Sequence, residues 1–409
     1  MRFDRAVRLF LTRLFVVPLL AALLQGQAGC IGAERPKRSW QELLDLRAAN
    51  EAKNDQALRA LRAKSIARLK AQYDDYAAGR RTQPPVADIL IVSGGGDWGA
   101  FGAGFLKGWG RVPAGDPLAR PQFDAVTGVS TGALIAPFAF LGDEASIERV
   151  NHLYRNPKKD WVKKRGPLYF LPHHISFAAV PGLERELKNN VTPDLVRRIA
   201  QGGDDGRILA VNTSNVDDGA PRVFDVVAEA KRATDTGDYK RIHRIMLASS
   251  GIPAAFPFRI IDHEMFVDGA VTGNIVYGGK TAEDDSLPAA WQRAYPDLPI
   301  PKVRFWVIFN NQFRPPPQVT APNWPAVITR GLEMGTRAAT LTAMRHLQAM
   351  AEISRLKRKS DVEVRIVAVP DNWAPPRPGV FLKETMNNLA DLGEKMGADP
   401  NSWTTGPLP

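Results

Sequence analysis

The sequence predicts an α/β fold with a central sheet that is mostly parallel but mixed. The chain has 409 residues, of which 44% are hydrophobic and 24% charged. This composition is typical of a folded globular protein and excludes collagen-like, disordered and polytopic membrane classes. Short β-branched and aliphatic runs alternate with longer helical stretches, as in parallel sheets that are covered by helices. In two places a glycine-containing turn directly follows a strand-like run.

The N-terminal segment has the order of a secretory signal. Arginines within residues 2–13 precede an apolar run at 14–24, and small residues follow. The run has eleven residues, whereas a membrane span needs about 20. We therefore expect residues 1–29 to be removed on export.

Cys30 is the only cysteine, so the chain can form neither an internal disulfide nor a cysteine zinc site. Ala28-Gly29-Cys30 resembles a bacterial lipobox, apart from Gln27 where an aliphatic residue is usual. We expect lipid on Cys30 and anchoring to a bacterial membrane, on its periplasmic side or at the cell surface. The alternative is an ordinary secreted protein in which Cys30 is a free thiol.

Residues 30–85 are predicted to form a helical extension ahead of one large domain at 86–409. Ser39 and Glu42 form a capping box, and Gly79 is a plausible stop after a stretch without proline or glycine. Such a helix packs on the main domain or spaces it from the membrane. Pro84-Pro85 ends the extension.

The large domain divides into alternating strand and helix candidates. Asp217-Asp218-Gly219 predicts a hairpin turn, which is why the sheet is expected to be mixed. The polar segments 281–300 and 314–317 are expected to be surface loops. The strand candidates are 87–92, 123–127, 208–212, 222–227, 303–309 and 362–369, and the main helix candidates are 131–140, 182–201, 239–249 and 325–358.

A glycine-rich loop at residues 93–100 follows the first predicted strand. Consecutive glycines can turn backbone N–H groups outward at a helix N-terminus, where an anion is favoured. Gly94, Gly96 and Gly99 also satisfy G-x-G-x-x-G, whereas no Gly-Lys-Ser/Thr follows, which excludes a P-loop. Taken alone, the loop is equally consistent with an oxyanion hole, a pyrophosphate site or a tight structural turn.

A second turn, Gly128-Val129-Ser130-Thr131-Gly132, has the G-x-S-x-G pattern of a nucleophile elbow. The glycines permit a sharp strand-to-helix turn that lifts the Ser130 hydroxyl out of the packing. The preceding strand-like run and the following apolar helix strengthen this interpretation.

The sequence offers no good histidine partner for this serine. Of six histidines only His346 comes late enough for the order serine, acid, histidine, and it lies within a predicted helix where a structural role is expected. Asp268, which ends a short apolar run and precedes Gly269, could serve as an acid without histidine. A plain Asp-Gly turn is the alternative.

Together the glycine loop, the elbow and Asp268-Gly269 resemble the ordered motifs of patatin-like phospholipases. Residues 248–257, with Ala248-Ser249 and Phe256-Pro257 at their ends, resemble the family segment that precedes the acid. The resemblance covers about residues 87–280 and leaves 301–409 as a C-terminal helix and strand extension. Trp98 departs from the pattern, which usually has arginine or lysine there, and Ser93 departs from the aspartate of plant members.

The resemblance implies a three-layer α/β/α hydrolase domain that acts on lipid esters. It implies a dyad in which Ser130 attacks an ester carbonyl and Asp268 takes its proton, through an acyl-serine intermediate. Backbone N–H groups of Gly95 and Gly96 would hold the oxyanion. No metal or cofactor is expected.

The charge predicts an anionic partner, because 54 Lys and Arg against 43 Asp and Glu give +11. Basic residues between 158 and 165 surround Trp161, with apolar residues at 168–171. This mixture suits docking on an anionic membrane surface, and a solvated basic loop is the alternative. No nucleic-acid-binding motif accompanies it, so no nucleic-acid partner is expected.

Two other functions fit parts of the sequence. A non-catalytic lipid-binding lipoprotein with the same fold would explain Trp98 in the glycine loop. A dinucleotide-dependent oxidoreductase would need an acid at the end of the second strand, about 20 residues beyond the loop. Asp116 lies in a Pro-Gly loop instead, which disfavours that function.

Overall fold

A computed structural model describes residues 35–166, 175–278 and 283–409. The predicted signal segment, Cys30 and the apolar residues 168–171 lie outside these ranges. Within them, no helix combines the length and the apolar character needed to cross a membrane.

The centre of the fold is an eight-stranded mixed sheet with the order β10-β9-β1-β2-β5-β8-β7, in which β6 also pairs with β5. The five strands from β10 to β5 are parallel, and β6, β7 and β8 run antiparallel to their neighbours, which confirms the predicted mixed sheet. The strands are β1 (Val86–Val92), β2 (Ala125–Val129), β5 (Ile208–Asn215), β6 (Pro221–Asp225), β7 (Arg259–Ile261), β8 (Glu264–Asp268), β9 (Lys302–Phe309) and β10 (Val362–Ala368). A two-stranded sheet pairs β3 (Lys163–Lys164) with β4 (Ala178–Ala179).

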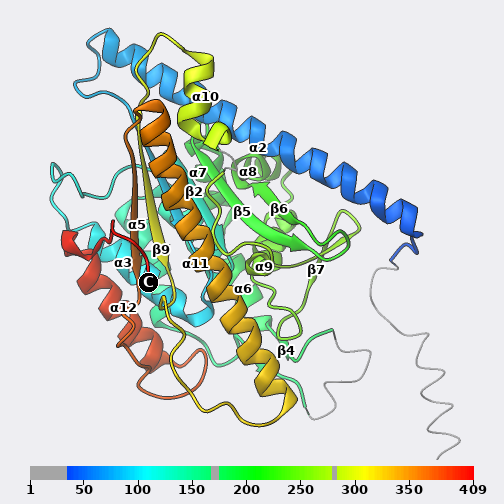
Figure 1. The fold of residues 1–409 in the computed structure, drawn as a ribbon. Coiled ribbons are helices and arrows are strands. Elements are labelled where there is room, and N and C mark those ends of the chain that lie inside the picture. Colours follow the sequence, from blue (N-terminus) through cyan, green and yellow to red (C-terminus); the bar gives the residue numbers. More distant parts are fainter. Residues whose placement is uncertain (1–34, 167–174, 279–282) are drawn as a thin grey trace, which may run out of the picture.

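Helices cover both faces of the sheet (Figure 1). Alternate side chains of a strand point to opposite faces, so Leu90 and Val92 of β1 pack in one core and Ile91 in the other. The first core lies under α3 (Gly99–Trp109), α4 (Thr131–Leu141), α5 (Glu144–Arg155), α6 (Pro181–Asn190), α7 (Pro193–Gly202), α8 (Val226–Thr236), α9 (Lys240–Ser249) and α12 (Lys383–Gly397). The second lies under α2 (Trp40–Ala77), α10 (Leu287–Ala294) and α11 (Trp324–Arg358).

The predicted N-terminal helix is one continuous element, α2. The Ser39 side chain accepts a hydrogen bond from the backbone N–H of Glu42 and the Glu42 side chain accepts one from that of Ser39, which confirms the capping box. Arg68 fixes the helix to the sheet, because its Nε donates to Asp124 just before β2 at 2.6 Å.

Two predictions of local structure are wrong. A single helix was expected over 182–201, but Thr192 caps a new helix and Pro193 occupies its first turn, so α6 and α7 are separate. The segment 281–300 was expected to be a surface loop, yet it contains α10. This helix is stabilised by Trp291, which is buried in the second core at 1% exposure.

Candidate active site

Ser130 occupies a strained turn between β2 and α4. Its backbone has φ 54° and ψ −123°, a conformation that costs a non-glycine residue about 1–3 kcal/mol. Gly128 and Gly132, on either side of Ser130, lie so close to backbone atoms that a larger residue would not fit. A Cβ on Gly132 would lie 2.1 Å from the carbonyl oxygen of Val92, and one on Gly128 would lie 2.3 Å from that of Gly132. The structure therefore has the strand–turn–helix geometry that the G-x-S-x-G pattern predicts.

Asp268 ends β8 and lies directly opposite Ser130. The Ser130 Oγ donates to Asp268 Oδ2 at 2.7 Å, and the backbone N–H of Ala270 donates to Oδ1 at 2.8 Å. The Asp268 side chain is almost completely buried, at 3% exposure. Burial raises its pKa to about 7, although the hydrogen bonds from Ala270 and Ser130 oppose that shift. At neutral pH the carboxyl group is therefore near its titration midpoint.

The glycine loop lies beside Ser130. A Cβ on Gly94 would approach the Ser130 Cβ to 2.9 Å, and a Cβ on Gly95 would lie 2.2 Å from the carbonyl oxygen of Asn310. Gly96 has a left-handed φ of +62° with open space where a Cβ would be. Among the described residues, none accepts a hydrogen bond from the backbone N–H of Gly95 or Gly96.

The two remaining motif glycines allow segments to pack closely. A Cβ on Gly99 would lie 2.1 Å from the Thr131 hydroxyl, at the contact between α3 and the elbow. A Cβ on Gly269 would lie 2.3 Å from the carbonyl oxygen of Asn212 on β5. Because neither glycine has a side chain, α3 can pack closely against the elbow, and the turn after Asp268 can pack closely against β5.

Two asparagines that sequence reasoning missed hold the glycine loop. Asn274 Oδ1 accepts from the backbone N–H of Gly94 at 2.8 Å. The side chain of Asn310 accepts from the backbone N–H of Gly102 and donates to the carbonyl oxygen of Ser93. Asn310 could have been found, because it directly follows a predicted parallel strand, and such carboxyl ends meet at one sheet edge. Asn274 carries no comparable signal in the sequence.

Two serines of the segment 248–257 were also missed, and they hold the elbow. Ser249 Oγ accepts from the backbone N–H of Ser130 at 3.0 Å and donates to the carbonyl oxygen of Asn212 at 2.7 Å. Ser250 Oγ donates to the carbonyl oxygen of Ser130 at 3.2 Å. The turn at Ser130 is thus hydrogen-bonded on both the N–H and the C=O of that residue.

Trp98 brings an indole ring to the glycine loop, and a cation lies over it. The guanidinium of Arg337, from α11, is 5.6 Å from the centre of the Trp98 ring. Arg337 also donates to the carbonyl oxygen of Gln312 and to Glu333 at 2.9 Å. A positive group is therefore present near the loop, but it comes from a distant segment and is paired with a carboxylate.

An apolar cavity adjoins Ser130. About 720 Å³ of empty space lies in it, a volume that includes its open mouth. Trp161 is buried in its wall, so its ring is not part of an exposed docking surface. Other apolar wall residues include Leu134, Phe138, Leu187, Ile252 and Phe381.

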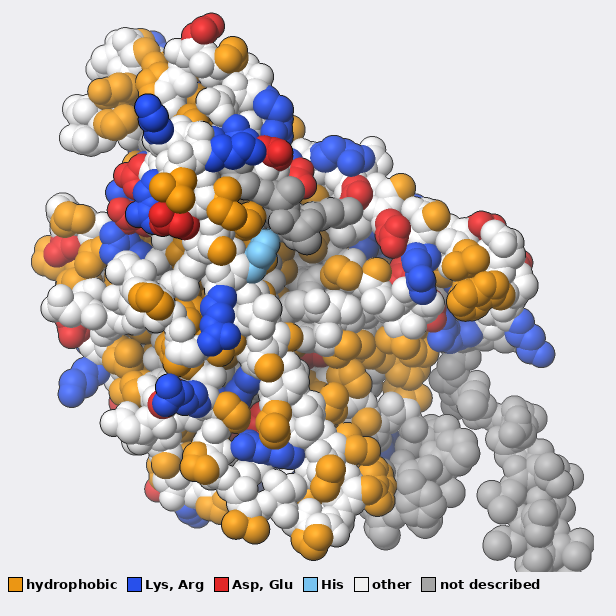
Figure 2. All heavy atoms as spheres, viewed as in Figure 1, with side chains coloured by type: hydrophobic (Ala, Val, Ile, Leu, Met, Phe, Trp, Pro, Cys, Tyr) orange, Lys and Arg blue, Asp and Glu red, His pale blue; other side chains and the backbone are white. Residues whose placement is uncertain are grey.

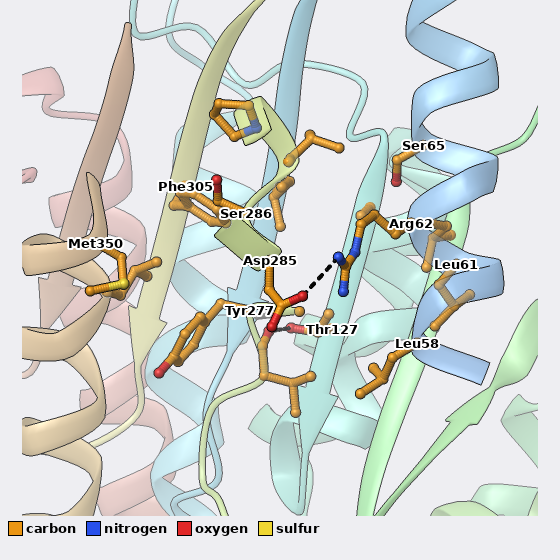
Figure 3. Close-up of a pocket in the computed structure, with 18 of the residues that line it drawn as sticks. Leu58, Leu61, Arg62, Ser65, Thr127, Tyr277, Asp285, Ser286, Phe305 and Met350 are labelled. Carbon is orange, nitrogen blue, oxygen red and sulfur yellow. Dashed lines mark hydrogen bonds and ion pairs between the residues drawn. The ribbon is translucent and has the colours of Figure 1, made fainter. Parts of the chain in front are cut away.

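A larger cavity, with about 1060 Å³ of empty space, lies on the opposite face of the sheet between α2 and α11 (Figure 3). Leu58 and Leu61 of α2, Phe305 of β9 and Met350 of α11 line it, and Arg62 and Asp285 form an ion pair at 3.2 Å. Neither Ser130 nor Asp268 contributes to its wall. The cavity that adjoins Ser130 is therefore the candidate active site.

Residues of the other functional schemes lie apart from Ser130. His346 bonds with the Tyr277 hydroxyl at 2.8 Å and lines the cavity on the opposite face. Asp116 accepts from the backbone N–H of Leu118 within its own loop. Across residues 35–166, 175–278 and 283–409, no cluster of three or more His, Cys, Asp or Glu side chains could hold a metal ion.

Comparison with known proteins finds a family model, described as patatin-like phospholipase, that matches residues 90–278. No curated protein matches the chain. Among solved structures, the crystal structure of VipD from Legionella pneumophila is similar, with 11% sequence identity and a TM-score of 0.35. That match covers 78% of this chain and 68% of VipD.

Proposed function

We propose that the protein hydrolyses carboxylic esters of lipids, with Ser130 as nucleophile and Asp268 as general base. The match of residues 90–278 to the patatin-like phospholipase family model supports this activity. The observation that carries the proposal is the 2.7 Å hydrogen bond from the Ser130 hydroxyl to Asp268, beside an apolar cavity. At this distance a proton can pass directly between the two oxygens.

In the proposed reaction, Ser130 Oγ attacks the ester carbonyl while Asp268 Oδ2 takes its proton. The backbone N–H groups of Gly95 and Gly96, which have no acceptor among the described residues, would donate to the tetrahedral oxyanion. Asp268 then returns the proton to the departing alcohol, which leaves an acyl group on Ser130. Water then attacks this acyl-serine while Asp268 takes its proton. Asp268 returns that proton to Ser130 Oγ, which releases the fatty acid and restores the serine.

The surroundings of Asp268 support its role as a base. An exposed carboxylate, with a pKa of about 3.9, is a weak base for a hydroxyl group. Burial raises the pKa of Asp268 to about 7, so its carboxylate accepts a proton more readily while a large fraction stays ionised at neutral pH.

The cavity beside Ser130 supports a substrate with a long apolar group. Leu134, Phe138 and Ile252 contribute aliphatic and aromatic surface to its wall, next to the nucleophile. Burial of an acyl chain there would be favourable in proportion to the area removed from water. We therefore propose that the acyl chain of the lipid ester occupies this cavity.

We further propose that the protein is exported and anchored by lipid on Cys30 after removal of residues 1–29. The order of basic, apolar and small residues in the sequence supports this. Metabolic labelling with an alkyne fatty acid should mark the parent protein and not Cys30→Ala. Equal labelling of both would contradict attachment at this thiol.

A serine-directed fluorophosphonate probe together with p-nitrophenyl acyl esters tests the catalytic proposal. The parent should be labelled and should turn over the esters, whereas Ser130→Ala and Asp268→Asn should each lose about 10³-fold or more of the activity. Ser65→Ala, in the wall of the other cavity, is the matched control and should retain both. Full esterase activity in Ser130→Ala would refute the proposal, and lipid binding without turnover by the parent would favour a non-catalytic lipid-binding protein.

A further inference from the structure

The N-terminal part of α11 presents large apolar side chains to the outside. We call residues 324–334 of this helix the α11 tip. Trp324 is 68% exposed, and the other apolar residues of the tip are about half exposed: Val327, Ile328, Leu332 and Met334. Because residues four apart share a helix face, Trp324, Ile328 and Leu332 form one continuous apolar stripe.

The charged residues of the α11 tip are directed toward the protein instead. Arg330 and Glu333 are its only charged residues, and they pair at 3.0 Å. Arg330 also donates to the carbonyl oxygen of Pro316, and Glu333 accepts from the buried Arg337. This is the reverse of a helix on a water-exposed surface, whose charged side faces the solvent.

The part of α11 that directly follows the tip lies at the glycine loop. Arg337 lies over Trp98, and Thr340 accepts from the same Asn274 side chain that holds Gly94. Trp324 lies 13 positions before Arg337, which corresponds to about 20 Å at the helical rise of 1.5 Å per residue. The tip therefore extends well beyond the loop that adjoins Ser130.

The topology places this extension at the active-site edge of the sheet. The chain leaves β9 at its carboxyl end, enters α11 there and returns along the helix to the start of β10, which is parallel to β9. Figure 1 shows the N-terminal end of α11 extending past the strands. Figure 2 shows hydrophobic side chains exposed in the same region of this face. Ser130, at the carboxyl end of β2, lies at the same edge.

We propose that the α11 tip is the surface by which the enzyme docks on an anionic lipid surface. This inference rests on the proposed function, because a lipid ester must reach Ser130 from its own aggregate at this edge. A tryptophan with aliphatic neighbours suits the interfacial region of a bilayer. Without residues 1–29, which carry four Arg and one Asp, the net charge is still +8 and favours anionic headgroups over long distances. No unpaired acidic side chain of the tip opposes them.

Vesicle co-sedimentation tests the proposal, with vesicles of phosphatidylcholine and phosphatidylglycerol. All chains carry Cys30→Ser, so that the contribution of the N-terminal segment is the same in each. The test variant combines Trp324→Ser, Ile328→Ser and Leu332→Ser. The matched control combines Ile353→Ser and Leu356→Ser, which are 40% and 74% exposed at the other end of the same helix.

The vesicle-bound fraction of the test variant should fall about tenfold or more, whereas the control should bind like the parent. Turnover of vesicle phospholipid should fall with binding, and turnover of soluble p-nitrophenyl butyrate should stay unchanged. Equal binding of test variant and parent would overturn the proposal. So would a parent that is dimeric in solution and a test variant that is monomeric, because a second copy would then cover the tip. An active Ser130→Ala would refute the catalytic proposal and leave the sedimentation comparison standing.

Discussion

Asn274 accepts a hydrogen bond from the backbone N–H of Gly94 at 2.8 Å, across 180 residues of sequence. The other end of the same amide donates to the Thr340 hydroxyl at 3.1 Å. The glycine loop is thus tied to α11 through one buried side chain. Because Gly95 and Gly96 follow directly, this bond sets where their N–H groups lie relative to Ser130.

Asn274→Ala should lower kcat about tenfold with a smaller change in KM. Loss of one buried hydrogen bond costs about 1–2 kcal/mol, and here it frees the loop that would stabilise the oxyanion. Steady-state kinetics with a p-nitrophenyl ester measure this effect. Thr340→Val removes only the second bond of Asn274 and should have a smaller effect. A larger loss in Thr340→Val than in Asn274→Ala would contradict this role for the Gly94 bond.

Activity should rise with pH through about 7 and level off above about 8. Burial raises the pKa of Asp268 to about 7, and only its ionised form can take the Ser130 proton. A profile of kcat/KM from pH 5 to 9 measures this directly. A rate that falls as pH rises through 7 would be inconsistent with Asp268 as the base.

Asp268→Asn should be more stable than the parent at pH 8 and about equal to it at pH 4. The pKa of Asp268 is higher in the folded than in the unfolded chain, so the folded state binds the proton of this carboxyl group more tightly. The contribution of Asp268 to the free energy of unfolding is therefore fully present below the unfolded pKa of about 3.9 and is lost as pH rises through about 7. Melting temperatures at the two pH values measure the difference, which we expect to reach a few degrees at pH 8. An Asn variant that melts below the parent at pH 8 would contradict a burial cost at this position.

Gly95→Ala should destabilise the protein far more than Gly96→Ala. A Cβ on Gly95 meets the backbone of Asn310 at 2.2 Å, so segments must move apart, at a cost of about 3 kcal/mol. Gly96 has open space, and alanine there meets only the left-handed backbone penalty of about 1 kcal/mol. Urea unfolding of both variants gives the comparison, and equal losses would mean that the Asn310 contact relaxes freely.

Leu134→Trp should shift ester preference toward short acyl chains. Leu134 lines the cavity beside Ser130 together with Phe138, and a larger ring removes space there. We expect kcat/KM for dodecanoyl esters to fall about tenfold while that for butanoyl esters changes little. Leu58→Trp, in the opposite cavity, is the control and should leave the preference unchanged. A parallel loss for both ester lengths in Leu134→Trp would place the acyl chain elsewhere.

Local patterns predict those parts of the site that depend on nearby residues. The elbow at Ser130 follows from glycines two positions away on either side, because its turn needs close backbone contacts at both. The helix α2 follows from its capping box, and the β5–β6 hairpin follows from an Asp-Gly turn. Local signals fail where packing decides. The acidic run at residues 283–285 makes the region look like a surface loop, yet Leu287–Ala294 folds as a helix because Trp291 is buried in the second core.

The sequence by itself determined the motifs of the proposed chemistry, since the turn at Ser130, the glycine loop and the Asp-Gly pair are all set by residues within a few positions. Only the tertiary structure decided that Ser130 and Asp268, 138 residues apart, share a hydrogen bond, and that burial raises the pKa of the acid. It also decided that Asn274 ties Gly94 to α11 and that the apolar side of the α11 tip faces outward. These relationships depend on which surfaces of distant elements meet and exclude water, and spacing along one chain does not encode them.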